Sequence, residues 1–280
     1  MTAQRPCVLV FAGHDPSGGA GIQADIEAIA AQGAHALTVI TSLTVQDNNQ
    51  VHAVHPVAPD IVSAQAQNLI KHFTVNVVKL GIVGSLENAL VIASLISELR
   101  SKNPDLSVVL DPVLSSGHGH KLALDDAVLA IAPLLEVATL ITPNLPEAMR
   151  LAPHGLTAAQ QATSLFGGAC RDVLLKGGHG QEQQVCNRWF SQRAQFFELT
   201  WNWPRLSFEF HGSGCTLAAA IAGQLACGHS MEKSLHAAQS YTQLSLERAY
   251  PIAVGQLIPQ RHFVAPKINS LESDDRETIR

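Results

Sequence analysis

Apolar runs and segments of helical spacing alternate along most of the chain. The first run, Cys7–Ala12, is apolar at every position, which is typical of a strand buried on both faces of a parallel sheet. A glycine-rich loop over residues 13–21 follows. The segment 22–32 then has apolar residues at helical spacing and stops at Gly33, a suitable residue for the position after a helix. The pattern predicts a strand, a loop and a helix in succession.

The same alternation continues, which predicts a mostly parallel sheet with helices on both faces. Residues 185–199 break the rhythm, because aromatic and polar residues alternate there as in a hairpin at a sheet edge. We expect one domain over residues 1–267 and a polar, mobile tail over residues 268–280. The other predicted strands are 37–41, 75–80, 107–111, 139–141 and 172–176, and the other predicted helices are 58–72, 86–100, 124–135, segments up to Phe166, 217–227 and 231–249.

Composition narrows the class of protein. The net charge of −5 and the absence of any run of lysine or arginine argue against a nucleic-acid partner or an anionic membrane surface. No apolar run approaches the roughly 20 residues that a membrane helix needs. The five cysteines are odd in number, scattered and without metal spacing or a secretory leader, so we expect reduced thiols in the cytoplasm.

The stretch His211–Thr216 combines two glycines with hydroxyl residues and runs into an alanine-rich helix. The first amides of such a helix lack internal acceptors and carry the positive end of the helix dipole, so they suit an anion. Cys215 lies in that field, which favours its thiolate form and makes it a candidate proton acceptor. The alternative is an ordinary helix cap followed by a core cysteine.

Polar and glycine-rich turns follow most of the predicted strands, where ligands bind in open parallel sheets. Asp111 ends one strand and is either a cap or a holder of magnesium and its waters. Lys176 is either a surface charge or a cation aimed at a transferring phosphoryl group. Asn144 and Glu147 have the spacing of a capping box, whether or not they have a further role.

Two other kinds of site are less well supported. Residues 19–24 match the dinucleotide fingerprint GxGxxA, but the first glycine lies several residues past the strand. No lysine follows in the spacing of a phosphate-binding P-loop. A zinc site is disfavoured because no pair of the clustered histidines has the helical spacing of a metal site and the nearby glycines suit phosphate; these histidines are His14, His118, His120, His179 and His211.

Together these motifs resemble the hydroxymethylpyrimidine/phosphomethylpyrimidine kinases of thiamine synthesis, which belong to the ribokinase-like superfamily. The resemblance covers about residues 8–250 in matching order, and its first and last motifs are highly specific. The motifs are residues 12–25, 39–41 with Gln46, 110–113, 141–148, 176–179 and 211–216.

The resemblance implies a three-layer α/β fold and phosphorylation of 4-amino-5-hydroxymethyl-2-methylpyrimidine, and then of its monophosphate, with ATP and Mg²⁺. A cytoplasmic enzyme is expected, and a homodimer stays open. Carried over by position, the substrate residues are Gly13, Asp25, Gln46, Ile82 and Val113; the nucleotide and phosphate residues are Asp111, Asn144, Glu147, Lys176 and Gly178, with Asp111 and Glu147 toward magnesium; and the catalytic residues are Cys215, Lys176, Gly212, Ser213 and Gly214.

Several positions depart from the family pattern. His14 replaces a usual serine or threonine, and Ile82 replaces a methionine that often closes the pyrimidine pocket. The loop 114–120 lacks a lysine-containing run, residues 205–211 are about one residue short, and the usual glycine–proline–histidine ending is only faintly echoed by residues 255–262. These departures concern the nucleotide pocket and the second phosphorylation more than the fold. A pyridoxal kinase, or a pyrimidine-binding protein without turnover, are the alternatives.

Overall fold

The protein is built around a nine-stranded sheet with the strand order β3-β2-β1-β4-β5-β6-β7-β8-β9. The computed structural model describes residues 4–114, 126–180, 182–193 and 195–263. Strands β2, β1, β4, β5, β6 and β7 run parallel, whereas β3, β8 and β9 pair antiparallel at the two edges. The alternation of strand and helix along the chain therefore gives the expected mostly parallel sheet.

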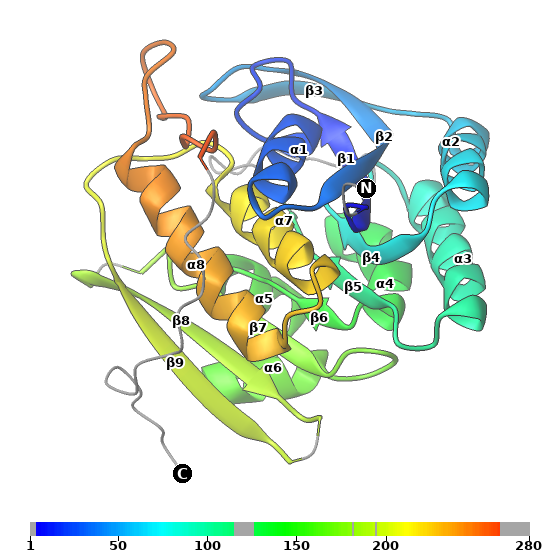
Figure 1. The fold of residues 1–280 in the computed structure, drawn as a ribbon. Coiled ribbons are helices and arrows are strands. Elements are labelled where there is room, and N and C mark those ends of the chain that lie inside the picture. Colours follow the sequence, from blue (N-terminus) through cyan, green and yellow to red (C-terminus); the bar gives the residue numbers. More distant parts are fainter. Residues whose placement is uncertain (1–3, 115–125, 181, 194, 264–280) are drawn as a thin grey trace.

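Helices cover both faces of this sheet, as Figure 1 shows. The strands are β1 Cys7–His14, β2 His35–Gln46, β3 Val51–Pro56, β4 Val75–Leu80, β5 Ser107–Leu110, β6 Leu140–Ile141, β7 Asp172–Leu175, β8 Gln184–Ser191 and β9 Phe197–Pro204. The helices are α1 Gly21–Ala31, α2 Pro59–His72, α3 Leu86–Lys102, α4 Ala127–Val137, α5 Leu145–Leu151, α6 Ala158–Leu165, α7 Ser213–Ala226 and α8 Met231–Glu247.

The apolar run of β1 is buried because its side chains supply two cores. Leu9 and Phe11 pack in the core shared with α2 to α6, whereas Val8 and Val10 pack in the core shared with α1, α7 and α8. Side chains of a strand alternate between faces, so a central strand with helices on both sides must be apolar throughout. The result is the predicted three-layer architecture.

Most of the predicted elements are confirmed, and the hairpin after β7 forms as β8 and β9 at the sheet edge. Two predictions were wrong in extent. Strand β2 runs from His35 to Gln46, whereas the prediction covered only residues 37–41. Helix α7 begins at Ser213 rather than at Leu217. Strand β3 was missed, because its short sequence Val51–Pro56 carries two histidines and ends in proline.

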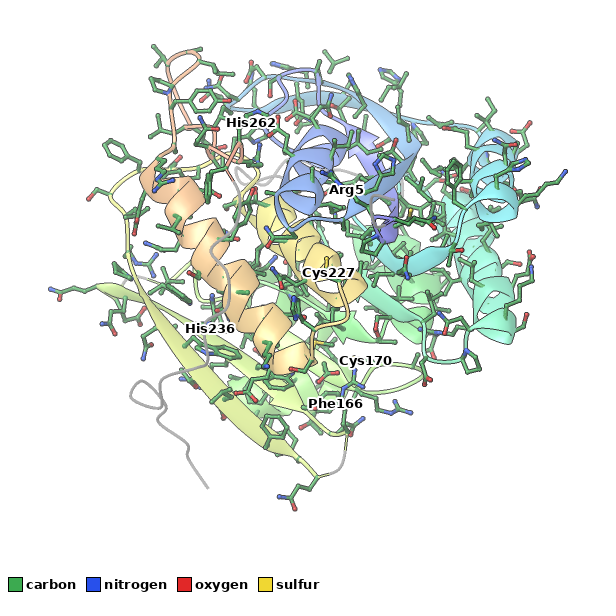
Figure 2. All side chains as sticks on the ribbon, in the orientation of Figure 1. Arg5, Phe166, Cys170, Cys227, His236 and His262 are labelled. Carbon is green, nitrogen blue, oxygen red and sulfur yellow. The ribbon has the colours of Figure 1, made fainter. Side chains whose placement is uncertain are left out.

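The predicted start of the helix over 124–135, the histidines at 118 and 120, most of the loop 114–120 and the tail 268–280 lie outside the described residues. Within the described part of the chain, no helix is long and apolar enough to cross a membrane. All five cysteines are free; Figure 2 shows Cys227 near the end of α7 and Cys170 in a different part of the fold.

Candidate functional site

A cavity of about 800 Å³ opens where the parallel strands end. Its walls come from the glycine loop after β1, the β2–β3 turn, the segments after β5, β6 and β7, and the beginning of α7. This is the edge at which the sequence placed the candidate ligand residues.

The cavity brings together every residue predicted to have a site role except Asp25. Their roles are still predictions, but their common location is a structural fact. The lining residues among them are Gly13, Gln46, Ile82, Asp111, Val113, Asn144, Glu147, Lys176, Gly178, Gly212, Ser213, Gly214 and Cys215.

The start of α7 offers backbone amides to the cavity. Gly212 precedes the helix with a left-handed φ of 79°, and no side chain caps this end. The first helical amides have no acceptor within the helix, so Ser213 and Gly214 can donate to an anion. A side chain at Gly214 would fall 3.4 Å from the Lys176 Nζ, so a glycine leaves room between the helix and the charged groups below it.

Charged side chains from two strand ends meet beside these amides. Lys176, directly after β7, donates to Asp111 Oδ1 at 2.7 Å, and Asp111 follows β5. Although burial alone would lower it, the pKa of Lys176 is raised by the Asp111 and Glu147 carboxylates. Lys176 is therefore a cation on the cavity wall, as predicted.

Glu147 belongs to the capping box predicted at the start of α5. The Asn144 backbone N–H donates to Glu147 Oε2 at 2.8 Å, and the Glu147 N–H donates to Asn144 Oδ1 at 2.9 Å. Burial, with a smaller contribution from Asp111, raises the pKa of Glu147 to about 7 despite the opposing charge of Lys176. The capping role is confirmed, and it leaves a buried carboxyl group in the cavity.

Asp111 and Glu147 form a donor set that fits magnesium. In the described parts of the chain, no group of three or more histidine, cysteine, aspartate or glutamate side chains is gathered as a closed metal site. Magnesium bound with phosphates needs only one or two carboxylates, because water and phosphate oxygens complete its shell. Such a cation would stabilise the ionised form of Glu147 against burial, which is the main cause of its raised pKa, and against the smaller repulsion from Asp111.

The expectation that the Cys215 thiolate is favoured was wrong. Burial raises the pKa of Cys215 to about 11, although Lys79 and a backbone hydrogen bond from Gly21 act in the opposite direction. Loss of water therefore outweighs the helix terminus. The thiol lines the cavity, but it is protonated at neutral pH.

Asp25 does not reach the cavity as a substrate ligand. Its side chain on α1 is fully buried, and Oδ2 accepts a hydrogen bond at 2.8 Å from Lys79, which is equally buried on β4. The predicted direct contact between Asp25 and the pyrimidine is therefore not supported. The pair could not be predicted from the sequence, because its members lie 54 residues apart.

The cavity wall around Ile82 is held in place by hydrogen bonds to the loop after β4. Thr41 donates to the Ile82 carbonyl at 2.5 Å. Asn88 donates to the carbonyls of Thr41, Val57 and Val83 at 3.0–3.2 Å. Ile82 lies beside Gly13, where an added Cβ would fall 3.9 Å from the Ile82 Cβ. The predicted pyrimidine pocket therefore has an apolar wall whose backbone is held by these hydrogen bonds.

Sequence reasoning missed several cavity residues on the hairpin side. Trp203 donates from Nε1 to Gln239 at 3.1 Å, and Arg205 donates to the carbonyls of Gly178 and Glu182 at 2.8 and 2.6 Å. Trp203 and Arg205 lie just past the predicted hairpin. His211 was part of a quoted motif but received no role, although it lines the cavity.

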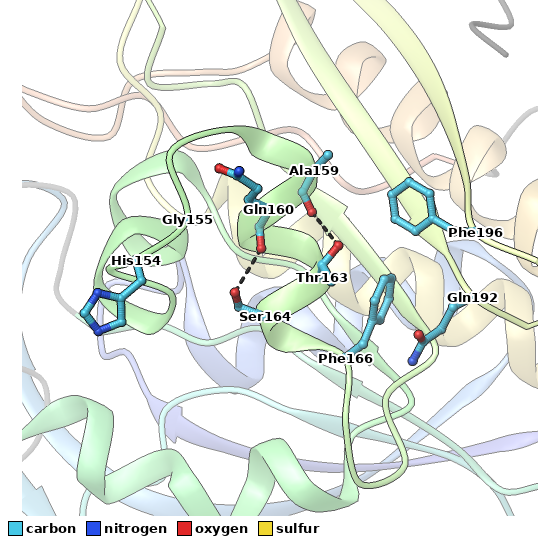
Figure 3. A pocket seen from close by; sticks show the side chains of 9 residues that line it. All are labelled: His154, Gly155, Ala159, Gln160, Thr163, Ser164, Phe166, Gln192 and Phe196. Carbon is cyan, nitrogen blue, oxygen red and sulfur yellow. Dashed lines mark hydrogen bonds between the residues drawn. The ribbon is translucent and has the colours of Figure 1, made fainter.

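A second hollow of about 610 Å³ lies beside α6. Figure 3 shows that the Thr163 and Ser164 hydroxyls donate to carbonyls of their own helix. His154 is the one titratable side chain among its lining residues, all of which are described. This hollow therefore lacks the charged groups that phosphoryl transfer requires.

The chain is similar to known kinases over nearly its whole length. A family model described as phosphomethylpyrimidine kinase matches residues 15–259. The hydroxymethylpyrimidine/phosphomethylpyrimidine kinase of Escherichia coli strain K12 is 35% identical over 270 residues, covering 94% of this chain and 99% of the relative.

Solved structures confirm the fold class. Pyridoxal kinase from Bacillus subtilis, solved as an ADP complex, has a TM-score of 0.79 at 25% identity and covers 92% of this chain and 98% of that one. Phosphomethylpyrimidine kinase from Clostridium difficile 630 has a TM-score of 0.69 at 28% identity and covers 85% and 98%. The predicted ribokinase-like architecture is therefore confirmed.

Proposed function

Because the chain belongs to the phosphomethylpyrimidine kinase family, we propose that it phosphorylates 4-amino-5-hydroxymethyl-2-methylpyrimidine with ATP, and then its monophosphate, in thiamine synthesis. One observation carries this proposal. The uncapped start of α7, the Lys176 cation and two carboxylates line one cavity together with the apolar wall at Ile82. That arrangement suits a phosphate donor beside a small ring.

Phosphoryl transfer passes through a loose transition state, so catalysis consists mainly of positioning and charge stabilisation. The amides of Ser213 and Gly214 would donate to the transferring phosphoryl oxygens, and Lys176 would supply a full positive charge from the end of β7. Asp111 and Glu147 would hold Mg²⁺. Magnesium, when bound, neutralises phosphate charge and orients the oxygens of the transferring group.

Cys215 is proposed as the proton acceptor of the first reaction only. The first acceptor is a neutral alcohol that must lose a proton, whereas a phosphate monoester with a second pKa near 6 is already ionised at neutral pH. Only the thiolate can accept that proton. Because burial raises the pKa of Cys215 to about 11, the rate of the first reaction relative to the second should rise with pH above neutrality. Ionisation of Glu147, whose pKa is about 7, affects both reactions alike and does not change this ratio.

The direct test is a product assay with the purified protein, ATP, Mg²⁺ and the pyrimidine alcohol, resolving monophosphate from diphosphate. We expect both products in sequence. Accumulation of monophosphate alone would remove the second step from the proposal. Binding of the pyrimidine with no phosphorylated product would instead identify a binding protein without turnover.

Pyridoxal kinase is the second candidate, because the Bacillus subtilis pyridoxal kinase shares this fold over 92% of the chain. Pyridoxal also carries a hydroxymethyl group on a flat ring. Comparing kcat/KM for the two alcohols under identical conditions separates the candidates. We expect the pyrimidine to be preferred, and a higher value for pyridoxal would reverse the assignment.

We also propose that residues 1–267 form one domain, and we propose the homodimer that the sequence leaves open as a state to be tested. Sedimentation of the purified chain at several concentrations measures the assembly. A mass of one chain across the range would remove the dimer.

A further inference from the structure

Two glycine-rich loops that are far apart in the sequence, residues 13–21 and 211–216, meet at the cavity. Asp15 lies in the first loop and binds several of its donors. The Asp15 carboxylate is fully buried. It accepts hydrogen bonds at 2.8 Å from the Ser17 N–H, the Ser17 hydroxyl and the Ala20 N–H. The loop leading into α1 is therefore wrapped around one charged group.

The fourth partner of Asp15 comes from the other loop. His211 Nε2 lies 2.8 Å from Asp15 Oδ2, across 196 positions of sequence. Although burial alone would raise it, the pKa of Asp15 is lowered by the bonds from His211 and Ser17, so the carboxylate is ionised. His211 directly precedes Gly212, the N-cap residue before α7.

Close packing shows that the two loops fit together without spare room. A side chain at Gly19 would collide with the His211 ring, and one at Gly212 would collide with the Gly19 carbonyl. The direction of the α7 amides is therefore tied to the position of the first glycine loop. A change at either loop must be transmitted to the other.

We propose that the Asp15–His211 pair is a clamp that positions the amides of the anion-binding turn relative to the acceptor loop. This inference rests on the proposed kinase function of the same cavity. His211 acts through the Gly212 turn and is a positioning residue. Misplacing a reacting group by about 1 Å can cost about 100-fold in rate, so a loosened clamp should lower kcat more than it raises KM.

The fold should survive loss of the clamp, because a second residue joins the same loops from the core side. Arg261 is buried and donates from Nη2 to the Gly19 carbonyl at 2.5 Å and from Nε to Thr216 Oγ1 at 2.7 Å. These bonds keep the loops adjacent when His211 is replaced. The clamp can therefore be tested in a folded protein.

The experiment compares His211→Phe, which removes the donor, with His211→Gln, whose amide can still donate to Asp15. We expect His211→Phe to lower kcat about 100-fold for both phosphorylations, to raise the KM for ATP by a smaller factor and to leave the KM for the pyrimidine nearly unchanged. His211→Gln should recover most of the lost kcat. Asp15→Asn should be at least as slow as His211→Phe, because the amide also loses an acceptor for the Ser17 and Ala20 donors. The double variant should be no slower than Asp15→Asn alone, because the His211 contact is already lost in that variant.

Asp172→Asn is the matched control for a purely structural effect. Asp172 is a buried aspartate at the far end of β7 that accepts from Trp189 and Arg193 at 3.0 and 2.7 Å. Its replacement should lower the melting temperature but leave kcat unchanged. The clamp proposal is wrong if His211→Phe lowers the melting temperature but leaves kcat unchanged, as expected for this control. It is also wrong if His211→Gln is as slow as His211→Phe.

Binding of ADP separates failure of the clamp from failure of the proposed function. Titration calorimetry should show weaker ADP binding to His211→Phe than to the parent and near-parental binding to His211→Gln. This readout stands even if the parent enzyme prefers another acceptor. Equal ADP affinity in all three proteins would overturn the clamp, whereas absence of pyrimidine turnover by the parent would overturn only the substrate assignment.

Discussion

Two lysine–aspartate pairs of nearly equal length have opposite surroundings. Lys79 and Asp25 are joined at 2.8 Å, and Lys176 and Asp111 at 2.7 Å. Both lysines lie at the carboxyl end of a parallel strand. The side chains of the first pair are 0% exposed, whereas Lys176 is 12% exposed on the cavity wall.

This difference in exposure indicates that the Lys79–Asp25 pair stabilises the fold, whereas the Lys176–Asp111 pair is placed to act on a ligand. A fully buried pair cannot reach a ligand, and its attraction mainly offsets the cost of taking two charges out of water. The pair at the cavity can exchange its internal partner for a phosphate or a cation. Distance and residue type alone therefore do not identify a catalytic lysine, and access to the cavity does.

The largest expected effect is that of Lys176→Met on turnover. Removing the full charge that we propose to face the transferring phosphoryl group should lower kcat about 1000-fold in both phosphorylations. The measurement is steady-state kinetics on each acceptor. Lys102→Met, at an exposed helix pair with Glu98, is the control and should leave kcat unchanged. A loss of less than tenfold for Lys176→Met would remove this lysine from the catalytic account.

Lys79→Met should act on stability. It leaves the buried Asp25 without its cation, which we expect to cost about 3–5 kcal/mol in the free energy of unfolding. Urea denaturation measures this change, and Lys79→Met combined with Asp25→Leu should restore most of it.

Two results would contradict a supporting role for the inner pair. One is a double variant that is no more stable than Lys79→Met. The other is a single variant that keeps its stability while losing turnover, because the inner lysine would then act on the cavity.

The fold could be predicted largely because a parallel sheet leaves a strong signal. Strands such as β1 are apolar on both faces, and Gly33 marks the end of α1 with a φ of 92°. Strand β3 lacks that signal, since it lies at an edge and Val51 is its one buried residue. Edge strands face water, so they need no continuous apolar run and are hard to recognise from the sequence.

The site could be predicted where a motif follows a strand, and not where burial decides. Asp111 and Lys176 reach the cavity because strand ends converge there, and Gly212 reaches it because the start of α7 lies at the same edge of the sheet. The burial of Asp25 and the pKa of Cys215 depend on how neighbouring layers pack. Neither quantity can be obtained from spacing along the chain.

The smallest predicted effect concerns Glu147 and pH. Its raised pKa of about 7 means that the folded state prefers the neutral acid, so its contribution to stability is present at low pH and lost as the pH rises through about 7. Glu147→Gln lacks this loss and should gain up to about 2 kcal/mol relative to the parent between pH 5 and pH 8. Thermal unfolding with EDTA present measures it, and parallel curves for the two proteins would contradict the raised pKa.

The central claim is that the thiolate form of Cys215, at the anion-binding turn, takes a proton in the first phosphorylation, whereas Cys215 has no such task in the second. The decisive measurement is kcat of Cys215→Ala for the two half-reactions, determined separately from purified pyrimidine alcohol and purified monophosphate. The account predicts a loss of about 1000-fold in the first and less than about threefold in the second. An equal loss in both half-reactions would contradict it.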